Sequence, residues 1–407
     1  MSRLTYLLIR LFTYPFSFLS YPMLHRLGTW LGEFAFCCLP KFRKRALSNL
    51  SLAPSLNLDP DQIERIAKES FHNLMITFLE YPKLAREKNI ARLAICETPE
   101  PAATLVKQRR GVIFFCGHQA NWEILFLEGT SRMPGVAIGR PLANRHLYRW
   151  VLGIREKFGG KIIEPKNAFK EGLRALKRGA FLGIVGDQGM PDSGFATEFL
   201  GRKAYTSTLP ALLAYRSGSP IFVASILRKG GRYSIHYSNP LYADLSQEMS
   251  EEVPRLMRSV LTHFEKSVEK HPGQWLWQHN RWKLQRTGIV RRIYRHDALC
   301  IAMPQDPLLF HQLWPQVLSL KEIFPDEHLT LLLPSHASPR PIPFAASCRY
   351  YNKLADLLIK DYAPKMLLNF TGDPTLSKHY CKLSVLKTLT LDDFLPHINF
   401  RKVLCKG

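Results

Sequence analysis

The chain has 407 residues, of which 46% are hydrophobic and 11% aromatic, and this composition allows two or three well-packed domains and excludes a generically disordered protein. Its 56 Lys and Arg residues outnumber 33 Asp and Glu residues, and the net charge of +23 implies an acidic partner: a nucleic acid, an anionic membrane surface or an acidic carrier. Nucleic acid ranks last, because the basic residues are dispersed and no zinc-finger spacing or aromatic RNA-binding motif is present.

The first 40 residues predict a membrane-associated helical segment. Residues 4–24 are nearly all apolar or aromatic, but Arg10, Pro15 and Pro22 interrupt them and make an imperfect span. A basic cluster follows at residues 41–45, and no signal-peptide cleavage site of small residues is present. The segment fits a spanning or interfacial anchor with its basic cluster on the cytoplasmic side, or an amphipathic helix pair packed on the domain. The basic cluster favours membrane association.

An α/β layer structure with a largely parallel sheet is predicted after this segment. Apolar residues at three- and four-residue spacing predict a helix over 59–84, and Asp59 before Pro60 is its start signal. Four short apolar runs then predict buried strands, and the stretches between them predict helices. The strands are 112–116, 136–138, 181–185 and 221–227, and the helices are 122–127, 147–158, 168–177 and 209–217.

Polar residues follow all four predicted strands. They are His118, Arg140, the pair Asp187 and Gln188, and Arg228. Because ligands of open α/β sheets gather at the carboxyl ends of the strands, we expect these positions to converge on one site. Each residue taken singly also fits a loop charge or a turn cap, and their expected convergence is what makes them candidates.

The stretch 117–123 has the sequence Gly-His-Gln-Ala-Asn-Trp-Glu and is the most informative part of the chain. Residues five apart on one helix do not share a face, so His118 should precede the helix, with Gly117 in a sharp turn and Asn121 as the helix cap. Glu123 then falls in the first turn and can reach back to the imidazole, and a histidine polarised by a carboxylate is a general base. A bare His-x4-Glu is more often a loop histidine and a first-turn carboxylate, but the strand and Asn-Trp-Glu context favours catalysis.

Other chemistries have no visible motif. The chain contains no nucleotide-binding glycine loop, no His-Glu-x-x-His and no Gly-x-Ser-x-Gly elbow. Covalent serine catalysis therefore has no candidate nucleophile, and His118 is expected to activate a hydroxyl of the substrate. The eight cysteines form no Cys-x-x-Cys pair, which fits a reducing compartment.

The segment 21–283 resembles the bacterial lipid A secondary acyltransferases, the lauroyl and myristoyl transferases, within the wider lysophospholipid and glycerolipid acyltransferase superfamily. The resemblance rests on ordered blocks: Gly117, His118, Asn121, Trp122 and Glu123; Arg140, Pro141, Leu142 and Asn144; Asp187 and Gln188; Phe199, Leu200, Gly201 and Arg202 with Thr206 and Pro210; Gln274, Trp275, Leu276 and Trp277; and Arg281, Trp282 and Lys283. Asn49, Leu50 and Glu80 fit the family's amino-terminal part. Several ordered blocks are far more specific than His-x4-Glu alone.

The resemblance implies a glycerolipid-acyltransferase-like sheet flanked by helices. It implies transfer of a fatty acyl chain from acyl carrier protein to a hydroxyl of a lipid A precursor at the cytoplasmic face of the bacterial inner membrane, without a metal or cofactor. By this likeness His118 is the base and Glu123 its orienting partner. The substrate-binding or oxyanion candidates are Arg140, Asp187, Gln188, Asn121 and Arg202. The positive charge suits an acidic carrier and a phosphorylated glycolipid in an anionic leaflet.

Three parts are expected: a hydrophobic membrane anchor over 1–40, an acyltransferase domain over 41–287, and a carboxyl-terminal α/β extension over 288–407. The family normally ends close to the tryptophan-rich segment, so the extension goes beyond it and is long enough for another small domain. Within the extension, 298–303, 329–333 and 366–370 predict strands, and 308–323, which contains Pro315, predicts a helix. The run 320–334 resembles the first half of heptosyltransferase-type glycosyltransferases but lacks a donor-sugar site. We expect the extension to be structural or partner-binding.

Near the end of the acyltransferase segment, Trp275, Gln278, His279 and Trp282 are spaced to share a helical face, which is usually core. Flanking charges leave open an interfacial role for one or two of these tryptophans.

Several alternative functions remain open. The enzyme alternatives are an acyl-CoA-dependent acyltransferase of another glycolipid or of a lysophospholipid, and a bifunctional acyl and glycosyl transferase. A catalytically idle membrane scaffold is disfavoured, because a scaffold has no use for His118 and Glu123.

Overall fold

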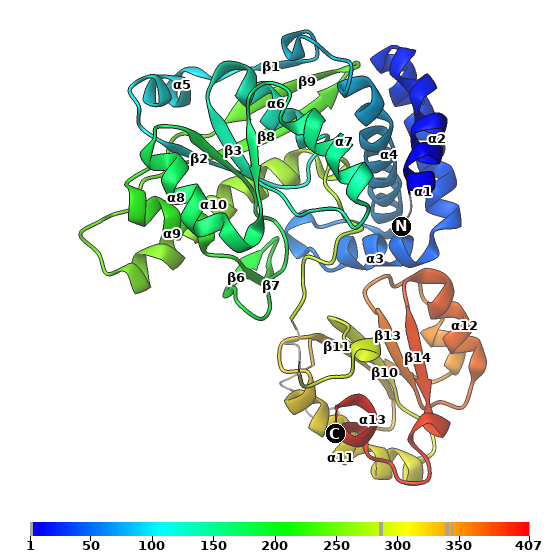
Figure 1. The fold of residues 1–407 in the computed structure, drawn as a ribbon. Helices are drawn as coiled ribbons and strands as arrows, with labels where there is room; N and C mark the ends of the chain where they lie inside the picture. The colour runs from blue at the N-terminus through cyan, green and yellow to red at the C-terminus, as the bar shows by residue number, and fades with distance from the viewer. Residues whose placement is uncertain (1–2, 285–287, 338–341, 343–344, 407) are drawn as a thin grey trace. The chain divides into compact units, whose positions relative to one another are not determined.

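A computed structural model describes residues 3–284, 288–337, 342 and 345–406 (Figure 1). The chain divides into two compact units. Unit 1 combines Met1–Cys38, Lys68–Gln188 and Thr206–Leu276, and unit 2 combines Leu39–Ala67, Gly189–Tyr205 and Trp277–Gly407. Both units are assembled from separated stretches of sequence. The expected boundaries at 40/41 and 287/288 stay a prediction.

The amino-terminal part of unit 1 is helical, with α1 over Arg3–Thr13, the 3-10 helix η1 over Tyr14–Phe18 and α2 over Tyr21–Cys38. In the part of the chain that the structure describes, none of the helices combines the length and the apolar character needed to cross a bilayer. The membrane association expected of residues 1–40 stays a prediction.

Helix α2 packs closely on α4, the long helix that spans Pro60–Leu84 as predicted. Gly28 and Gly32 lie about one turn apart on α2. A Cβ atom would lie 2.8 Å from the Cα of Ile76 at the first position and 2.6 Å from the Cα of His72 at the second. Two residues without side chains therefore let the two backbones approach each other.

Unit 1 contains a seven-stranded mixed sheet whose strand order is β1-β9-β8-β2-β5-β3-β4. The strands are β1 (Ala94–Cys96), β2 (Val112–Cys116), β3 (Gly135–Ile138), β4 (Lys161–Ile163), β5 (Phe181–Val185), β8 (Ile221–Lys229) and β9 (Arg232–Tyr237). Neighbouring strands are parallel except β8 and β9, which form an antiparallel hairpin. The four predicted strands and the largely parallel sheet are confirmed. Every residue of β2 is buried, as its continuous apolar run predicts.

Five helices of unit 1 lie between these strands in the sequence, α5 to α9, and α10 follows the last strand, β9 (Figure 1). They are α5 (Glu100–Lys107), α6 (Glu123–Arg132), α7 (Arg145–Arg155), α8 (Ala168–Lys177), α9 (Leu209–Ser217) and α10 (Met249–Lys270). The four predicted helices are confirmed. Helix α10 was not predicted, although it buries apolar residues along its length. Its internal proline, Pro254, lies in the second turn.

Unit 2 contains a five-stranded parallel sheet with the order β12-β11-β10-β13-β14. Its strands are β10 (Ala298–Ala302), β11 (His328–Pro334), β12 (Ser347–Tyr351), β13 (Met366–Asn369) and β14 (Lys387–Thr390), and its carboxyl-terminal helices are α11 (Pro307–Ile323), α12 (Pro374–Leu383) and α13 (Phe400–Leu404). The three strands and the helix predicted in the extension are confirmed, and so is its α/β character. Both faces of this sheet are covered by buried apolar residues.

Unit 2 also includes stretches that precede the extension in sequence. They carry α3 (Pro40–Ser51) and the hairpin of β6 (Phe195–Phe199) and β7 (Arg202–Thr206), of which Thr206 falls in unit 1. The sheet of the extension therefore shares one compact unit with segments from earlier in the chain.

A buried ion cluster joins these segments to the carboxyl-terminal sheet within unit 2. Asp297 directly precedes β10. Its carboxylate accepts hydrogen bonds from Nζ of Lys365 at 2.7 and 2.8 Å. The same carboxylate forms an ion pair with Arg202 at 2.9 Å. Lys365 also donates to Oδ1 of Asn49 in α3 at 2.6 Å. The amide of Asn49 donates to the carbonyl oxygen of Trp277 at 2.8 Å. The extension thus supplies both an anion and a cation to earlier parts of the chain.

Candidate active site

The turn after β2 is built for close packing. A Cβ at Gly117 would lie 2.0 Å from Cζ of Phe264 and 2.8 Å from Oδ2 of Asp187, so no side chain fits there. The glycine therefore lets the backbone pass directly beneath Asp187, and the next residue, His118, emerges at the end of the strand.

His118 and Asp187 form a hydrogen-bonded pair. Nδ1 of His118 lies 2.7 Å from Oδ1 of Asp187, and the backbone N–H of His118 donates to Oδ2 at 2.8 Å. The indole Nε1 of Trp275 donates to the same Oδ2 at 2.8 Å. An ionised carboxylate only accepts hydrogen bonds, so Nδ1 carries the proton and Nε2 is the ring nitrogen that would accept one from a substrate. The two residues meet because β2 and β5 are adjacent parallel strands that end at the same edge.

The pKa of His118 is raised above its ordinary value. Burial of the ring lowers the pKa, but the charge and hydrogen bond of Asp187 favour the protonated ring more strongly. The negative charge of Glu123 acts in the same direction. The ring of Trp122 lies edge-on to the imidazole, with centroids 4.6 Å apart. This environment strengthens His118 as a proton acceptor and stabilises the imidazolium that proton transfer would form.

The backbone around residues 274–276 braces the His118 turn. The N–H of Ala120 donates to the carbonyl of Gln274 at 2.7 Å, and the N–H of Leu276 donates to the carbonyl of His118 at 3.1 Å. The helix inferred from the tryptophan spacing is wrong, because only Pro272–Gln274 forms a short 3-10 helix and Trp275 has extended backbone. The predicted core position is confirmed for Trp275, Gln278 and Trp282, which are buried, whereas His279 is half-buried.

Glu123 lies in the first turn of α6, as predicted, and is buried. Its carboxylate accepts hydrogen bonds from the hydroxyl of Tyr81 and from Nε of Arg155, both at 2.7 Å. We expected Glu123 to orient the imidazole, whereas the carboxylate bonded to the His118 ring is that of Asp187. The catalytic role of Glu123 stays a prediction, supported here by its electrostatic effect on His118.

The structure brings two of the strand-end candidates into direct contact, His118 and Asp187. Gln188 is half-buried beside Asp187, and Arg140 is exposed in the loop after β3. Arg228 lies within β8, and its guanidinium donates to side chains of α4. Substrate contacts of Arg140 and Gln188 stay predictions.

The other two candidates make structural contacts. The amide of Asn121 donates to Oε2 of Glu80 at 2.7 Å, and its Oδ1 accepts the backbone N–H of Glu123 at 3.2 Å. It thus supports the start of α6 from one residue before the N-cap position, which Trp122 occupies instead of the expected Asn121. Arg202 belongs to unit 2 and pairs with Asp297. A substrate contact for either residue stays a prediction.

Sequence reasoning missed Tyr81 and Arg155, which lie 42 and 32 positions from Glu123 and carry no local signal. Trp275 was singled out for its spacing and as part of a family block, but not as a donor to Asp187. Among the residues that the structure describes, no group of three or more His, Cys, Asp and Glu side chains is placed to hold a metal ion.

Known proteins are similar to the chain over most of its length. Residues 3–284 match the family described as bacterial lipid A biosynthesis acyltransferase. The chain is 24% identical over 284 residues to the lipid A biosynthesis lauroyltransferase of Escherichia coli (strain K12), which covers 67% of this chain and 90% of that relative. It is 24% identical over 280 residues to the lipid A biosynthesis palmitoleoyltransferase of the same strain and to a lipid A biosynthesis acyltransferase of Shigella flexneri, with 66% of this chain and 88% of each relative covered.

The fold and the site define an α/β protein with a candidate general-base histidine at the strand ends. Since the family match covers well over half of the chain, the chain belongs to the bacterial lipid A biosynthesis acyltransferase family.

Proposed function

We propose that this chain transfers a fatty acyl group from acyl carrier protein to a hydroxyl of a lipid A precursor at the cytoplasmic face of the inner membrane. Family membership and the names of the relatives support the reaction class and the acceptor. The contact between His118 and Asp187 is the single observation that carries the mechanism.

In the proposed reaction His118 acts as the general base. Its Nε2 accepts the proton of the acceptor hydroxyl while the hydroxyl oxygen attacks the thioester carbonyl carbon. The carbon–oxygen bond forms, the carbon–sulfur bond breaks, and the proton passes from the imidazolium to the departing thiolate. Asp187 holds the ring through Nδ1 and, with Glu123, stabilises the transient positive charge. Arg140 and backbone N–H groups near the turn are the candidate donors to the oxyanion.

The acyl donor is proposed from charge. A net charge of +23 favours an acidic protein such as acyl carrier protein, because opposite charges accelerate encounter and hold the complex. The same charge favours a phosphorylated acceptor in an anionic leaflet.

Membrane-surface association is proposed from helix α1. None of its residues is buried, and Leu4, Leu11 and Phe12 are 63%, 69% and 72% exposed. An amphipathic helix with such a face lies in the interface between lipid headgroups and acyl chains.

The test uses full-length protein in mixed micelles with acyl carrier protein or CoA thioesters as donors. Acceptors are a lipid A precursor, a lysophospholipid and an unrelated glycolipid. We expect acylation of the lipid A precursor with carrier-bound donors. A preference for CoA thioesters or for either of the other acceptors would replace this assignment with one of the alternatives.

His118→Ala should lower kcat/KM by about 10² to 10⁴-fold, the usual contribution of a general base. His146→Ala is the matched control, because His146 is an exposed histidine of α7 in the same unit and should be silent. The double variant His118→Ala with Asp187→Asn should be little worse than His118→Ala alone, since the pair acts as one unit. A folded His118→Ala protein with near wild-type turnover would exclude the mechanism.

A further inference from the structure

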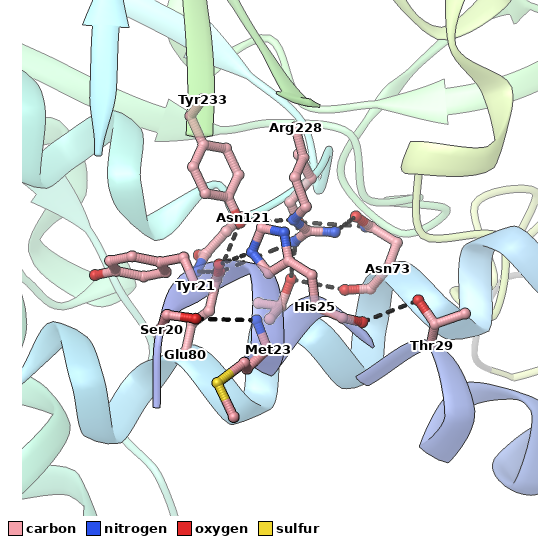
Figure 2. A network of polar contacts seen from close by, with 12 residues as sticks. Ser20, Tyr21, Met23, His25, Thr29, Asn73, Glu80, Asn121, Arg228 and Tyr233 are labelled. Atoms are coloured by element: carbon pink, nitrogen blue, oxygen red, sulfur yellow. Dashed lines mark hydrogen bonds and ion pairs between the residues drawn. The ribbon is translucent and has the colours of Figure 1, made fainter. Parts of the chain in front are cut away.

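Glu80 is a fully buried carboxylate in α4 that collects donors from separate parts of unit 1 (Figure 2). Nε2 of His25 in α2 lies 2.7 Å from its Oε1. The amide of Asn121 and the hydroxyl of Tyr233 in β9 donate to its Oε2 at 2.7 and 2.6 Å. Arg228 in β8 lies 4.0 Å away. These donors and this cation offset the cost of burying the carboxylate.

Glu80 is held in its ionised form. Burial raises the pKa of the carboxyl, but the hydrogen bond from His25 and the charge of Arg228 lower it further than burial raises it. Both oxygens of an ionised carboxylate accept hydrogen bonds. If a glutamine replaced Glu80, its NH2 group would face N–H or O–H groups that also donate, and those hydrogen bonds would be lost.

One of these bonds reaches the turn that carries the candidate catalytic groups. Asn121 donates to Glu80 and accepts the backbone N–H of Glu123. The preceding residue, Ala120, has a φ of +43°, a conformation that residues with a side chain rarely adopt. A strained turn of this kind persists only when its surroundings enforce it.

A second set of hydrogen bonds links the same turn to side chains of α4. The carbonyl oxygen of Ala120 accepts hydrogen bonds from Thr77 at 3.0 Å and Asn73 at 3.3 Å. Both side chains are held by Arg228, whose guanidinium donates to Oδ1 of Asn73 and Oγ1 of Thr77. The Nε of Arg228 also donates to Tyr233 at 2.7 Å, and this bond closes the network around Glu80.

We propose that Glu80 is a positioning residue for acyl transfer: through Asn121 it holds the strained turn between His118 and Glu123 in its reactive shape. His25 extends this control to α2, so the docking of α2 on α4 is coupled to the geometry of the turn. This inference rests on the proposed function, because its kinetic consequence requires His118 to act as the base.

The test compares Glu80→Gln with Glu33→Gln. Glu33 is the matched control, because it also joins α2 to α4 through a histidine, with Oε1 2.7 Å from Nε2 of His72, but its side chain is 49% exposed and this bond does not lead to the turn. Misplacement of a catalytic group by about 1 Å costs on the order of 10²-fold in rate, so Glu80→Gln should lower kcat by about that factor with KM little changed. Glu33→Gln should leave both constants unchanged.

A second readout needs no substrate. The rate at which diethyl pyrocarbonate modifies His118, followed by peptide mass spectrometry, should rise in Glu80→Gln and stay at the wild-type value in Glu33→Gln. If wild-type protein acylates none of the acceptors, the proposed function fails, while this labelling still reports whether Glu80 holds the turn. Unchanged kcat and unchanged labelling in folded Glu80→Gln would overturn the proposal.

Two further variants keep the test decisive. If Glu80→Gln does not fold, Tyr233→Phe removes a single hydroxyl from the carboxylate and should lower kcat several-fold at constant KM. Unchanged kcat in this variant would also overturn the proposal. If Glu80 acts through Asn121, Glu80→Gln combined with Asn121→Ala should be little worse than Asn121→Ala alone, and additive losses would contradict that route.

Discussion

At the scale of single residues, His118 lies between opposing influences. Burial lowers the pKa of the imidazole, and the neighbouring charges of Asp187 and Glu123 raise it by more. A base must be unprotonated, so the acidic limb of the kcat/KM profile should have its midpoint above about 6.5, the ordinary histidine value. Activity should therefore increase as the pH rises through that midpoint.

Asp187→Asn should shift this midpoint to lower pH, because it removes the charge that contributes most to the raised pKa of His118. Glu123→Gln should shift it less, since Glu123 acts on the ring by charge alone whereas Asp187 also bonds it. The measurement is kcat/KM as a function of pH for the wild type and both variants. An unchanged midpoint in active Asp187→Asn would show that another group controls the acidic limb.

At the scale of elements, α1 and α2 differ in how they use their apolar residues. Helix α2 packs Gly28 and Gly32 against α4, whereas α1 leaves its apolar side chains on the surface. A helix that only completed a core would bury such residues, so the exposure of α1 supports the proposed association with a membrane surface.

Leu11→Glu should weaken binding to vesicles that contain anionic lipid. Inserting a leucine side chain contributes roughly 1.5 to 3 kcal/mol, so the partition coefficient should fall about tenfold or more. Leu308→Glu is the matched control, because Leu308 on α11 is 76% exposed and undergoes the same change of charge. Sedimentation with vesicles measures both variants. Equal binding by the two would place the membrane contact away from α1.

At the scale of the whole molecule, the extension completes unit 2 through buried charges. Deleting residues 288–407 would remove Asp297 and Lys365, and with them the ion-pair partner of Arg202 and the donor to Oδ1 of Asn49. We therefore expect the extension to be needed for stability, even though the groups at the His118 site all lie in unit 1.

Asp297→Asn should lower the free energy of unfolding by about 3 to 5 kcal/mol, the usual cost of breaking a buried ion pair. Asp326→Asn is the control in the same unit, because Asp326 pairs with Lys203 at 2.6 Å near the surface and such pairs contribute about 0 to 1 kcal/mol. Urea unfolding at pH 7 measures both. Equal losses would mean that the buried cluster adds no more than a surface pair.

The same cluster predicts a dependence of stability on pH. Burial raises the pKa of Asp297, but the charges of Lys365 and Arg202 lower it further, to about 2. A depressed carboxyl pKa stabilises the fold above the unfolded value of about 3.9, and this stability is lost as the pH falls toward 2. Wild-type protein should therefore lose more stability than Asp297→Asn between these pH values.

Much of the fold is determined by local sequence. The strand over 112–116 and the helix over 168–177 have the predicted ends, because their apolar periodicity is a property of neighbouring residues. The position of His118 after a buried strand and of Glu123 in the first turn of a helix follows from the same local signals. Strands such as β1 and β4 were missed, because three residues carry too little pattern.

The tertiary structure decided which side chains meet. Asp187 reaches His118 across 69 positions only because β5 lies beside β2, and strand order is not encoded in any local spacing. The helical spacing of Trp275 and Trp282 was misleading, since Trp275 has extended backbone and its neighbours Gln274 and Leu276 bond to the His118 turn. The ion pair between Arg202 and Asp297 of the extension also joins residues far apart in the sequence, and only the packing of unit 2 brings them together. Periodicity is a local property, whereas the partners of a buried charge depend on how distant segments pack.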